Sequence, residues 1–149
     1  MSRVRRSFVG ATSELLLVGM AAVVSATPGT GVSGTILAKG TSPNGIEVVS
    51  SREKADVAVL EIAPGGSTGW HYHDGQVIAV VKSGTLTRTL HDCSPEVTSS
   101  GGSFVEPAGR QHTHIGRNVG TEPVVLLVTY VLPAGQPLSQ DAPQPQCAL

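Results

Sequence analysis

The feature that most constrains the fold of this chain is its division into short apolar runs by clusters of Gly, Pro, Ser, Asn and Asp. The runs are rich in Val, Ile and Leu, residues that pack well on a pleated sheet. We predict strands at residues 32–38, 45–50, 55–63, 69–73, 76–82, 85–91, 102–106, 111–117 and 122–132, and no helix. Closely spaced strands with turn residues between them are typical of an all-β sandwich or barrel.

The composition agrees with a single β domain and argues against several functions. Aromatic residues make up 3% of the chain, so the core must be built from Val, Ile, Leu and Ala. The net charge is −1, without a basic patch or an aromatic platform on which bases could stack. Binding of nucleic acid is therefore not supported. The chain also lacks an apolar run long enough for stable insertion into a membrane.

Four of the five histidines occur in two pairs, each with the spacing i, i+2. The first pair is His71 and His73, and the second pair is His112 and His114. Because successive side chains of a strand alternate between its two faces, both members of a pair should point to the same face. Imidazole is the commonest protein ligand for first-row divalent metals. The pairs therefore predict a shared metal site, whereas the alternative is a coincidence of surface histidines on alternating strands.

Both pairs lie in motifs that resemble the two motifs of the cupin family. The residues that carry the resemblance are His71, His73 and Gly84 in the first motif, and Gly101 or Gly102, Pro107, Gly109 and His112 in the second. The second motif reads Pro-x-Gly-x-x-His in register. The resemblance covers residues 55–133 and implies the cupin fold, a single jelly-roll β-barrel. Because one fold of this kind hosts many functions, the motifs are much less specific for an activity.

The two histidines of the second motif can be aligned in two ways. His112 fits Pro-x-Gly-x-x-His, counted from the turn, whereas His114 fits His-x-x-x-Asn, counted back from Asn118. We expect both to face the barrel interior and to approach the metal. His112 is then the third ligand, and His114 is a fourth ligand or a hydrogen-bonding neighbour. The alternative is a bulge between them, which would turn one of the two outward.

The acidic ligand of the first motif is absent from its usual place. The resemblance puts this residue four positions after the second His, where the chain has Val77. Gln76 is one position early and is a weak substitute. Glu106, just before the second motif's Pro, either faces the site or caps the edge of the barrel. Imidazoles alone would leave the metal's double charge uncompensated, so the site should favour an anionic substrate or a bound hydroxide.

The resemblance implies one divalent metal ion, which could be Fe, Mn, Zn, Ni or Cu, and a small-molecule ligand or substrate. One hypothesis is a metal-dependent enzyme similar to a dioxygenase or an isomerase, with open metal positions for water, dioxygen or substrate. The alternative is a non-catalytic module that holds a metal or a small ligand in its barrel. A structural cupin without metal is a third hypothesis. Pairing into a homodimer is implied by the resemblance alone.

The N-terminus has the pattern of an export signal over residues 1–26. A basic start that includes Arg5 and Arg6 precedes the apolar stretch 15–24, and small residues end the segment at Ala26. The apolar stretch is too short to span a membrane. The arginine pair, followed after one position by two apolar residues, resembles a twin-arginine signal, and an ordinary secretory signal is the alternative. We therefore predict a periplasmic or extracellular protein.

After the signal, we expect an N-terminal extension with the first strands at 27–54, the barrel at 55–133 and an extended tail at 134–149. The only two cysteines, Cys93 and Cys147, most simply form a disulfide in an exported protein, with two free thiols as the alternative. The bond would tie the tail to the loop after the first motif. Closing a loop of this length is worth at most roughly 4 kcal/mol.

The twin-arginine interpretation can be tested by substituting both arginines. Arg5→Lys together with Arg6→Lys should block translocation, because this route reads the guanidinium pair and an ammonium group lacks the planar fork of donors. The measurement is the fraction of the protein found outside the cytoplasm after cell fractionation. Unchanged export of the variant would assign the chain to the general secretory route.

Overall fold

The computed structural model describes residues 28–36, 38–50 and 60–148, and the regular secondary structure of these residues is almost entirely β-strand. Its strands are β1 (Thr30–Gly34), β2 (Ala38–Thr41), β3 (Ile46–Ser50), β4 (Leu60–Ser67), β5 (His71–Tyr72), β6 (Gln76–Ser83), β7 (Thr85–Thr89), β8 (Pro95–Ser99), β9 (Ser103–Glu106), β10 (Ile115–Arg117), β11 (Val124–Pro133) and β12 (Gln140–Asp141). Two 3₁₀ turns, η1 (Arg110–His112) and η2 (Gln146–Ala148), complete the described elements. The predicted all-β fold is confirmed, and the predicted export signal at 1–26 lies outside the described residues.

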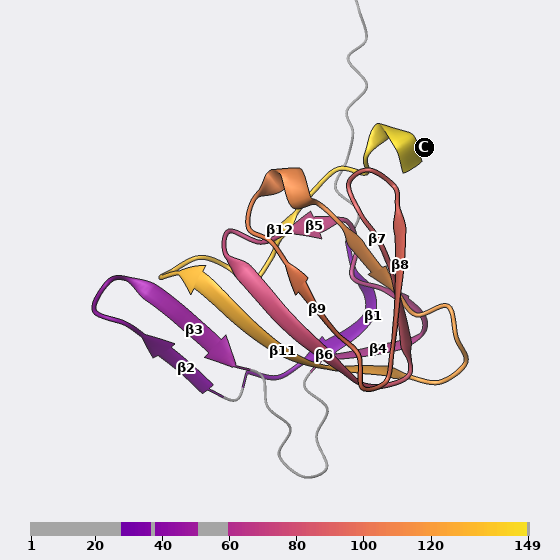
Figure 1. The fold of residues 1–149 in the computed structure, drawn as a ribbon, viewed down its shortest axis with the longest axis horizontal. Coiled ribbons are helices and arrows are strands. Elements are labelled where there is room, and N and C mark those ends of the chain that lie inside the picture. The colour runs from indigo at the N-terminus through magenta and orange to yellow at the C-terminus, as the bar shows by residue number, and fades with distance from the viewer. Residues whose placement is uncertain (1–27, 37, 51–59, 149) are drawn as a thin grey trace, which may run out of the picture.

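Ten of the described strands form one sheet, which curls into a nearly closed barrel (Figure 1). β11 is its central strand and pairs antiparallel with β3, β4 and β6. From β4 the sheet continues through β10 and β7 to β8, while β6 continues to β9. β5 and β12 form a separate two-stranded sheet at one end of the barrel (Figure 1). No helix among the described residues is long and apolar enough to cross a membrane.

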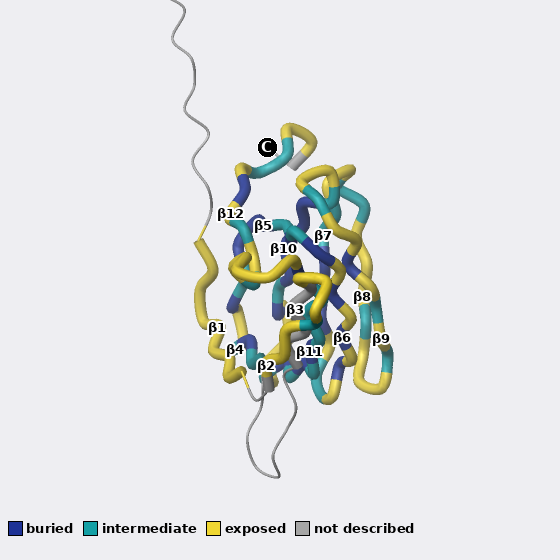
Figure 2. The backbone as a smooth tube through the Cα atoms, turned by 90° about the vertical axis from the view of Figure 1, so that its left-hand side faces the viewer, coloured by how far each residue is buried: buried dark blue, intermediate teal, exposed yellow. Residues whose placement is uncertain are grey.

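The barrel core follows from the alternation of side chains along the strands. In β6, Val77, Ala79 and Val81 are at most 2% exposed, whereas Ile78 and Val80 point outward. The same alternation along neighbouring strands is visible in the burial of the backbone tube (Figure 2). The main buried cluster consists of Ile62, Val77, Ala79, Val81, Leu86, Val124, Leu126 and Val128. Its members are all aliphatic, as the scarcity of aromatic residues predicts.

Several element boundaries differ from the prediction. The predicted turn at 64–67 continues β4, with Gly65 at a φ of 75° that suits glycine. The predicted strand 111–117 is replaced by η1 and the shorter β10, because the Thr113 backbone N–H and hydroxyl both donate to the carbonyl of Arg110. β2, β8 and β12 were not predicted as strands, because their segments are polar. They are extended because each pairs with a neighbouring strand.

The C-terminal segment is attached to the barrel by a covalent bond. Cys93 and Cys147 form a disulfide with a Cα–Cα distance of 6.0 Å, which confirms the predicted pairing. Cys93 lies in the loop between β7 and β8, and Cys147 lies in η2 near the end of the chain. The predicted extended tail is therefore fixed at its far end, and β12 joins it to β5 in between.

Asn118 ties together three parts of the barrel at the end of β10. Its side chain is 1% exposed, and its Nδ2 donates to the carbonyls of Ile62 and Glu122, each at 2.8 Å. Its Oδ1 accepts a hydrogen bond from the Gly120 backbone N–H at 3.0 Å. Because carbonyls left without a donor cost free energy when buried, Asn118 is a structural residue of the corner between β10 and β11.

Asn118→Ala should lower the free energy of unfolding by about 2–4 kcal/mol, since it leaves two carbonyls without their donor. Val119→Ala is the matched control, because the Val119 side chain is 73% exposed and its truncation should change stability by less than about 0.5 kcal/mol. Urea denaturation followed by circular dichroism measures both values. Equal stability of the two variants would contradict the structural role of Asn118.

Candidate metal centre

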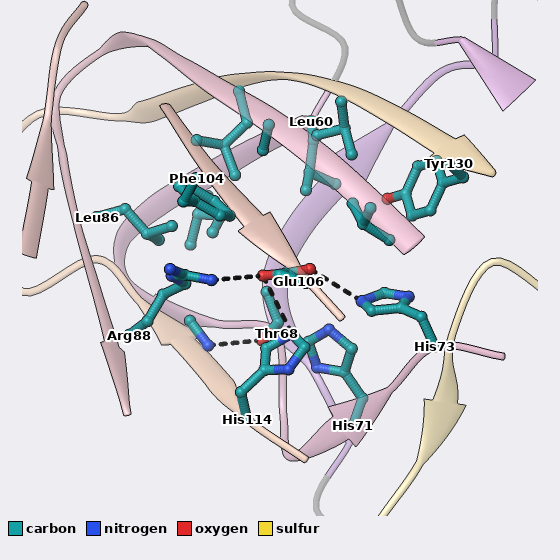
Figure 3. A pocket seen from close by; sticks show the side chains of 16 residues that line it. Leu60, Thr68, His71, His73, Leu86, Arg88, Phe104, Glu106, His114 and Tyr130 are labelled. Carbon is teal, nitrogen blue, oxygen red and sulfur yellow. Dashed lines mark hydrogen bonds and ion pairs between the residues drawn. The ribbon is translucent and has the colours of Figure 1, made fainter. Parts of the chain in front are cut away.

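Three histidines and one glutamate meet at the end of the barrel beside β5 (Figure 3). The group consists of His71, His73, Glu106 and His114, which we call the His3Glu group. One ligand atom of each residue lies within 4.8 Å of those of the other three, and the four residues are at most 8% exposed. Side chains from three separate segments therefore converge on one point, as the ligands of a single ion must.

Backbone pairing brings the two histidine segments together. The His71 N–H donates to the carbonyl of His114, and the His114 N–H donates to the carbonyl of His71, each at 2.9 Å. This isolated β-bridge places the two ring centres 4.4 Å apart. His73 follows two positions after His71, and its ring centre lies 4.9 Å from that of His71. The two motifs thus meet as the histidine pairs predict, and His114 is the histidine of the second motif that lies beside the first pair.

Each imidazole of the group is oriented by a hydrogen bond to a backbone carbonyl. The Nδ1 atom of His71 lies 2.9 Å from the Gly69 carbonyl oxygen, and that of His114 lies 2.8 Å from the His112 carbonyl oxygen. The Nδ1 atom of His73 lies 2.6 Å from the carbonyl oxygen of Leu138. A carbonyl can only accept, so Nδ1 carries the proton in all three rings. Nε2 is then left with its lone pair available to a metal, the usual arrangement of metal-binding histidines.

Glu106 stands where the missing acidic residue of the first motif would be. In the antiparallel pair of β6 and β9, Glu106 lies directly opposite Val77. Residues that are opposite in such a pair project to the same face, so the carboxylate enters the site from the neighbouring strand. The expectation of a site without a carboxylate is therefore not met. Gln76, the weak substitute, is exposed and lies outside the group.

His112 lies outside the His3Glu group, although the sequence favoured it as the third ligand. It is the last residue of η1, which follows Gly109 at a φ of 105°. The turn rotates His112 away from His114, and its ring centre lies 6.0 Å from that of His91 instead. The alignment counted back from Asn118 agrees with this geometry, whereas the alignment counted from the turn does not.

A buried arginine contacts Glu106 on the side away from His73 (Figure 3). Arg88 is 4% exposed, and its Nη1 lies 3.3 Å from Oε1 of Glu106. Its guanidinium also pairs with Glu96 on β8, and its central carbon lies 3.8 Å from the centre of the Phe104 ring. Because the planar guanidinium presents several donors in fixed directions, it holds the Glu106 carboxylate against the imidazoles. Nothing local in the sequence distinguishes Arg88 from a solvated arginine, and it was not predicted.

The charges of the group follow from burial and from these contacts. Burial acts to raise the pKa of Glu106, but contacts with His114 and His73 outweigh it and hold this pKa well below its usual value. Burial lowers the pKa of His71 to about 4, and the charge of nearby His114 adds to the effect. Burial also acts to lower the pKa of His114, yet Glu106 raises it above the usual value. At neutral pH the carboxylate is therefore ionised and His71 is neutral, the forms in which these groups bind metals.

Two nitrogen atoms of the group lack a hydrogen-bond partner. The Nε2 atoms of His73 and His114 are buried and lie 3.0 and 3.1 Å from oxygens of Glu106, without the geometry of a hydrogen bond. A buried polar atom without a partner is costly, and an ion between the Nε2 atoms and the carboxylate would satisfy all of them. Three imidazole nitrogens and one carboxylate oxygen suit first-row transition metals. The residues present therefore fit a divalent metal.

Comparison with known families agrees with the motifs, since residues 58–130 match the family model of the cupin domain. The chain belongs to the cupin superfamily. Its structure is similar to a conserved protein with a double-stranded β-helix domain from Klebsiella pneumoniae subsp. pneumoniae MGH 78578 (TM-score 0.54, 20% identity, 74% of this chain and 84% of that chain). It is also similar to an oxalate oxidase (TM-score 0.53, 22% identity, 87% and 70%). These likenesses confirm the jelly-roll fold. A comparison with curated protein sequences finds no match.

The His3Glu group borders a small cavity of about 40 Å³ inside this cupin barrel. A water molecule needs roughly 10–15 Å³ of such space, so only a few atoms fit there beside a metal. The wall is mostly apolar, with Leu86, Leu126 and Phe104 among its residues. Tyr130 adds a phenol, whose pKa is raised to about 12 by burial and by Glu106 and which therefore stays protonated. The cavity thus admits a small group and offers it a neutral hydroxyl.

The geometry predicts opposite results for the two histidines of the second motif. His114→Ala should weaken the binding of a divalent metal by at least about 100-fold, because a lost ligand costs more than the 10–100-fold typical of residues that only orient ligands. His112→Ala is the matched control and should stay within about threefold of the wild type, because its ring is outside the group. Isothermal titration of the metal-free protein with Zn²⁺ measures both affinities. A larger loss of Zn²⁺ affinity in His112→Ala than in His114→Ala would contradict this prediction and support the alignment counted from the turn.

Proposed function

We propose that this protein is an exported cupin that binds one divalent transition metal through His71, His73, Glu106 and His114 and acts on a small molecule there. The observation that carries the proposal is the convergence of four ligand atoms within 4.8 Å, with three imidazoles already oriented by carbonyls. Because the imidazoles are already oriented, metal binding loses less side-chain conformational entropy. The disulfide supports an oxidising compartment, which agrees with the export signal expected at 1–26.

The ligand set agrees with the metals expected from the resemblance and lowers the expected charge of the site. Imidazole and carboxylate together suit Mn, Fe, Ni, Cu or Zn, in keeping with the metals implied by the cupin resemblance. The ionised Glu106 cancels one of the two positive charges of the ion, so the charge is smaller than that expected for imidazoles alone. One net positive charge remains, and an anionic oxygen of a substrate would compensate it.

A bound metal would supply Lewis-acid or redox chemistry at its open positions. The chain's own residues determine what reaches it. On the inner side of the group, the mostly apolar cavity of about 40 Å³ admits only a small group. Two larger hollows border the same ligands, one of about 120 Å³ beside His71 and His73 and one of about 210 Å³ beside Glu106 and His114. The protonated Tyr130 can donate a hydrogen bond to such a group. A small carboxylate or a comparable oxygen-bearing molecule is the substrate class that these features favour.

The alternative is a non-catalytic module that holds a metal or a small ligand. The mostly apolar lining of the inner cavity favours it, because this lining offers few groups that could exchange protons with a substrate. His71, with a pKa of about 4, is a poor proton acceptor at neutral pH. Only a measurement of turnover separates the two functions.

We expect the purified protein to contain about one metal ion per chain, and His71→Ala together with His73→Ala to abolish this content. His91→Ala is the matched control, because His91 is exposed and outside the group, so its metal content should equal that of the wild type. Elemental analysis by mass spectrometry measures all three proteins. Full metal content in the double variant would contradict the proposed site.

The same proteins test for catalysis. Each is loaded with Mn²⁺, Fe²⁺ or Zn²⁺ and offered small carboxylates, including oxalate because one fold neighbour is an oxalate oxidase. Turnover by the wild type and by His91→Ala, but not by the double variant, supports the enzyme. Metal binding without any turnover supports the binding module.

A further inference from the structure

Part of the His3Glu group depends on a segment that lies beyond the cupin match at 58–130. Residues 136–147, which we call the strap, run along the end of the barrel where β5 lies (Figure 1). β12 of the strap pairs with β5 so that Gln140 is opposite Tyr72 and Asp141 is opposite His71. The strap is thus in backbone contact with the strand that carries the first ligand.

The three imidazoles differ in how they are oriented. His71 and His114 bond to carbonyls two residues earlier in their own segments, at Gly69 and His112. His73 bonds instead to Leu138, which is 65 residues away in the sequence and lies in the strap. Two ligands are therefore oriented by their own loops, whereas the third depends on the position of a distant segment.

The disulfide is the one covalent bond among the contacts that hold the strap to the rest of the described chain. Its strand β12 has two residues, and most of its side chains are exposed or half-buried. The Ala142 N–H donates to the Trp70 carbonyl at 2.8 Å, and Gln140 Nε2 donates to Asp74 Oδ2 at 2.8 Å. Ala142 is the one strap residue that is fully buried. The Cys93–Cys147 bond fixes the end of the strap, five residues after Ala142. Cys147 is exposed, so a reductant can reach it.

We propose that the disulfide-fastened strap positions His73, so that the redox state of Cys93 and Cys147 sets the affinity of the metal site. The proposal rests on the proposed metal binding. An external dithiol would reduce the bond, giving two electrons and two protons to form the Cys93 and Cys147 thiols while the dithiol itself becomes a disulfide. The released strap then no longer holds the Leu138 carbonyl against His73.

The expected effect is selective. Loss of a group that only orients a metal-binding histidine typically weakens metal binding by about 10–100-fold. His71 and His114 keep their carbonyl partners, because these lie in their own loops. A strap that merely stabilised the whole barrel would change all three histidines together. His73 is therefore the residue that separates a positioning role from a general structural one.

The test compares the wild type with Cys93→Ser together with Cys147→Ser in two measurements. The first is the Zn²⁺ affinity, which should fall by about 10–100-fold in the double variant. The second is the histidine side-chain ¹⁵N spectrum of the metal-free full-length protein. It should show a changed tautomer balance for His73 alone. Reduction of the wild type should reproduce the spectrum of the variant, and the same reductant should leave the variant's spectrum unchanged.

Gln140→Ala provides a second variant in which the disulfide remains. It removes the side-chain bond from the strap to Asp74 and should shift His73 in the same direction by a smaller amount. An unchanged His73 spectrum with a Zn²⁺ affinity within twofold of the wild type would overturn the proposal, in either variant that folds. Equal changes at all three histidines would overturn it as well. If the wild type binds no metal, the proposed function fails, but the spectrum of the metal-free protein still decides the role of the strap.

Discussion

The buried carboxylate of Glu106 is the group on which the charge balance of the barrel end depends. A carboxylate that is 8% exposed is tolerated only when other groups compensate its charge. Here Arg88 and His114 both approach the Oε1 atom of the carboxylate, and His73 approaches its Oε2 atom. Arg88 is itself buried against Phe104 and paired with Glu96, so the compensation extends from the centre of the group to the outer strand β8.

This chain of contacts joins the fold to the site. β9 supplies Glu106, β7 supplies Arg88 and β8 supplies Glu96. Among the described strands, β6 joins β9 to the rest of the sheet, and β10 joins β7 and β8 to it. The His71–His114 bridge joins the remaining ligands to each other. The members of the His3Glu group therefore come from different segments of the barrel. Their relative positions depend on the pairing between the strands that carry or adjoin them. Because Nδ1 carries the proton in His73 and His114, their two buried Nε2 atoms face the carboxylate without a hydrogen bond.

The orientation of the imidazoles shows two ways to build a site of this kind. Carbonyls two residues earlier orient His71 and His114, which is a local property of the loops that carry them. The carbonyl for His73 is supplied from the C-terminal segment, so it requires the tail to be folded back and fastened. A cupin barrel can thus be extended by a segment outside the family's common core without changing the ligands themselves.

The sequence by itself determined the properties that depend on near neighbours in the chain. Short apolar runs between turn residues predicted most of the strands, because residues such as Val, Ile and Leu pack well on a pleated sheet. The paired histidines predicted that two motifs would meet. The count of cysteines left one intramolecular pairing, Cys93 with Cys147.

Tertiary structure decided the rest, because register and turn geometry depend on contacts between distant residues. The register of β6 against β9 placed Glu106 opposite Val77 and supplied the carboxylate that the first motif lacks. Sequence alone left open whether Glu106 faces the site or caps the edge of the barrel. The 3₁₀ turn after Gly109 places His112 outside the His3Glu group and leaves His114 within it, although the two residues are two positions apart in the sequence. Spacing along a chain fixes which face a side chain takes within one strand, but not which strand lies beside it.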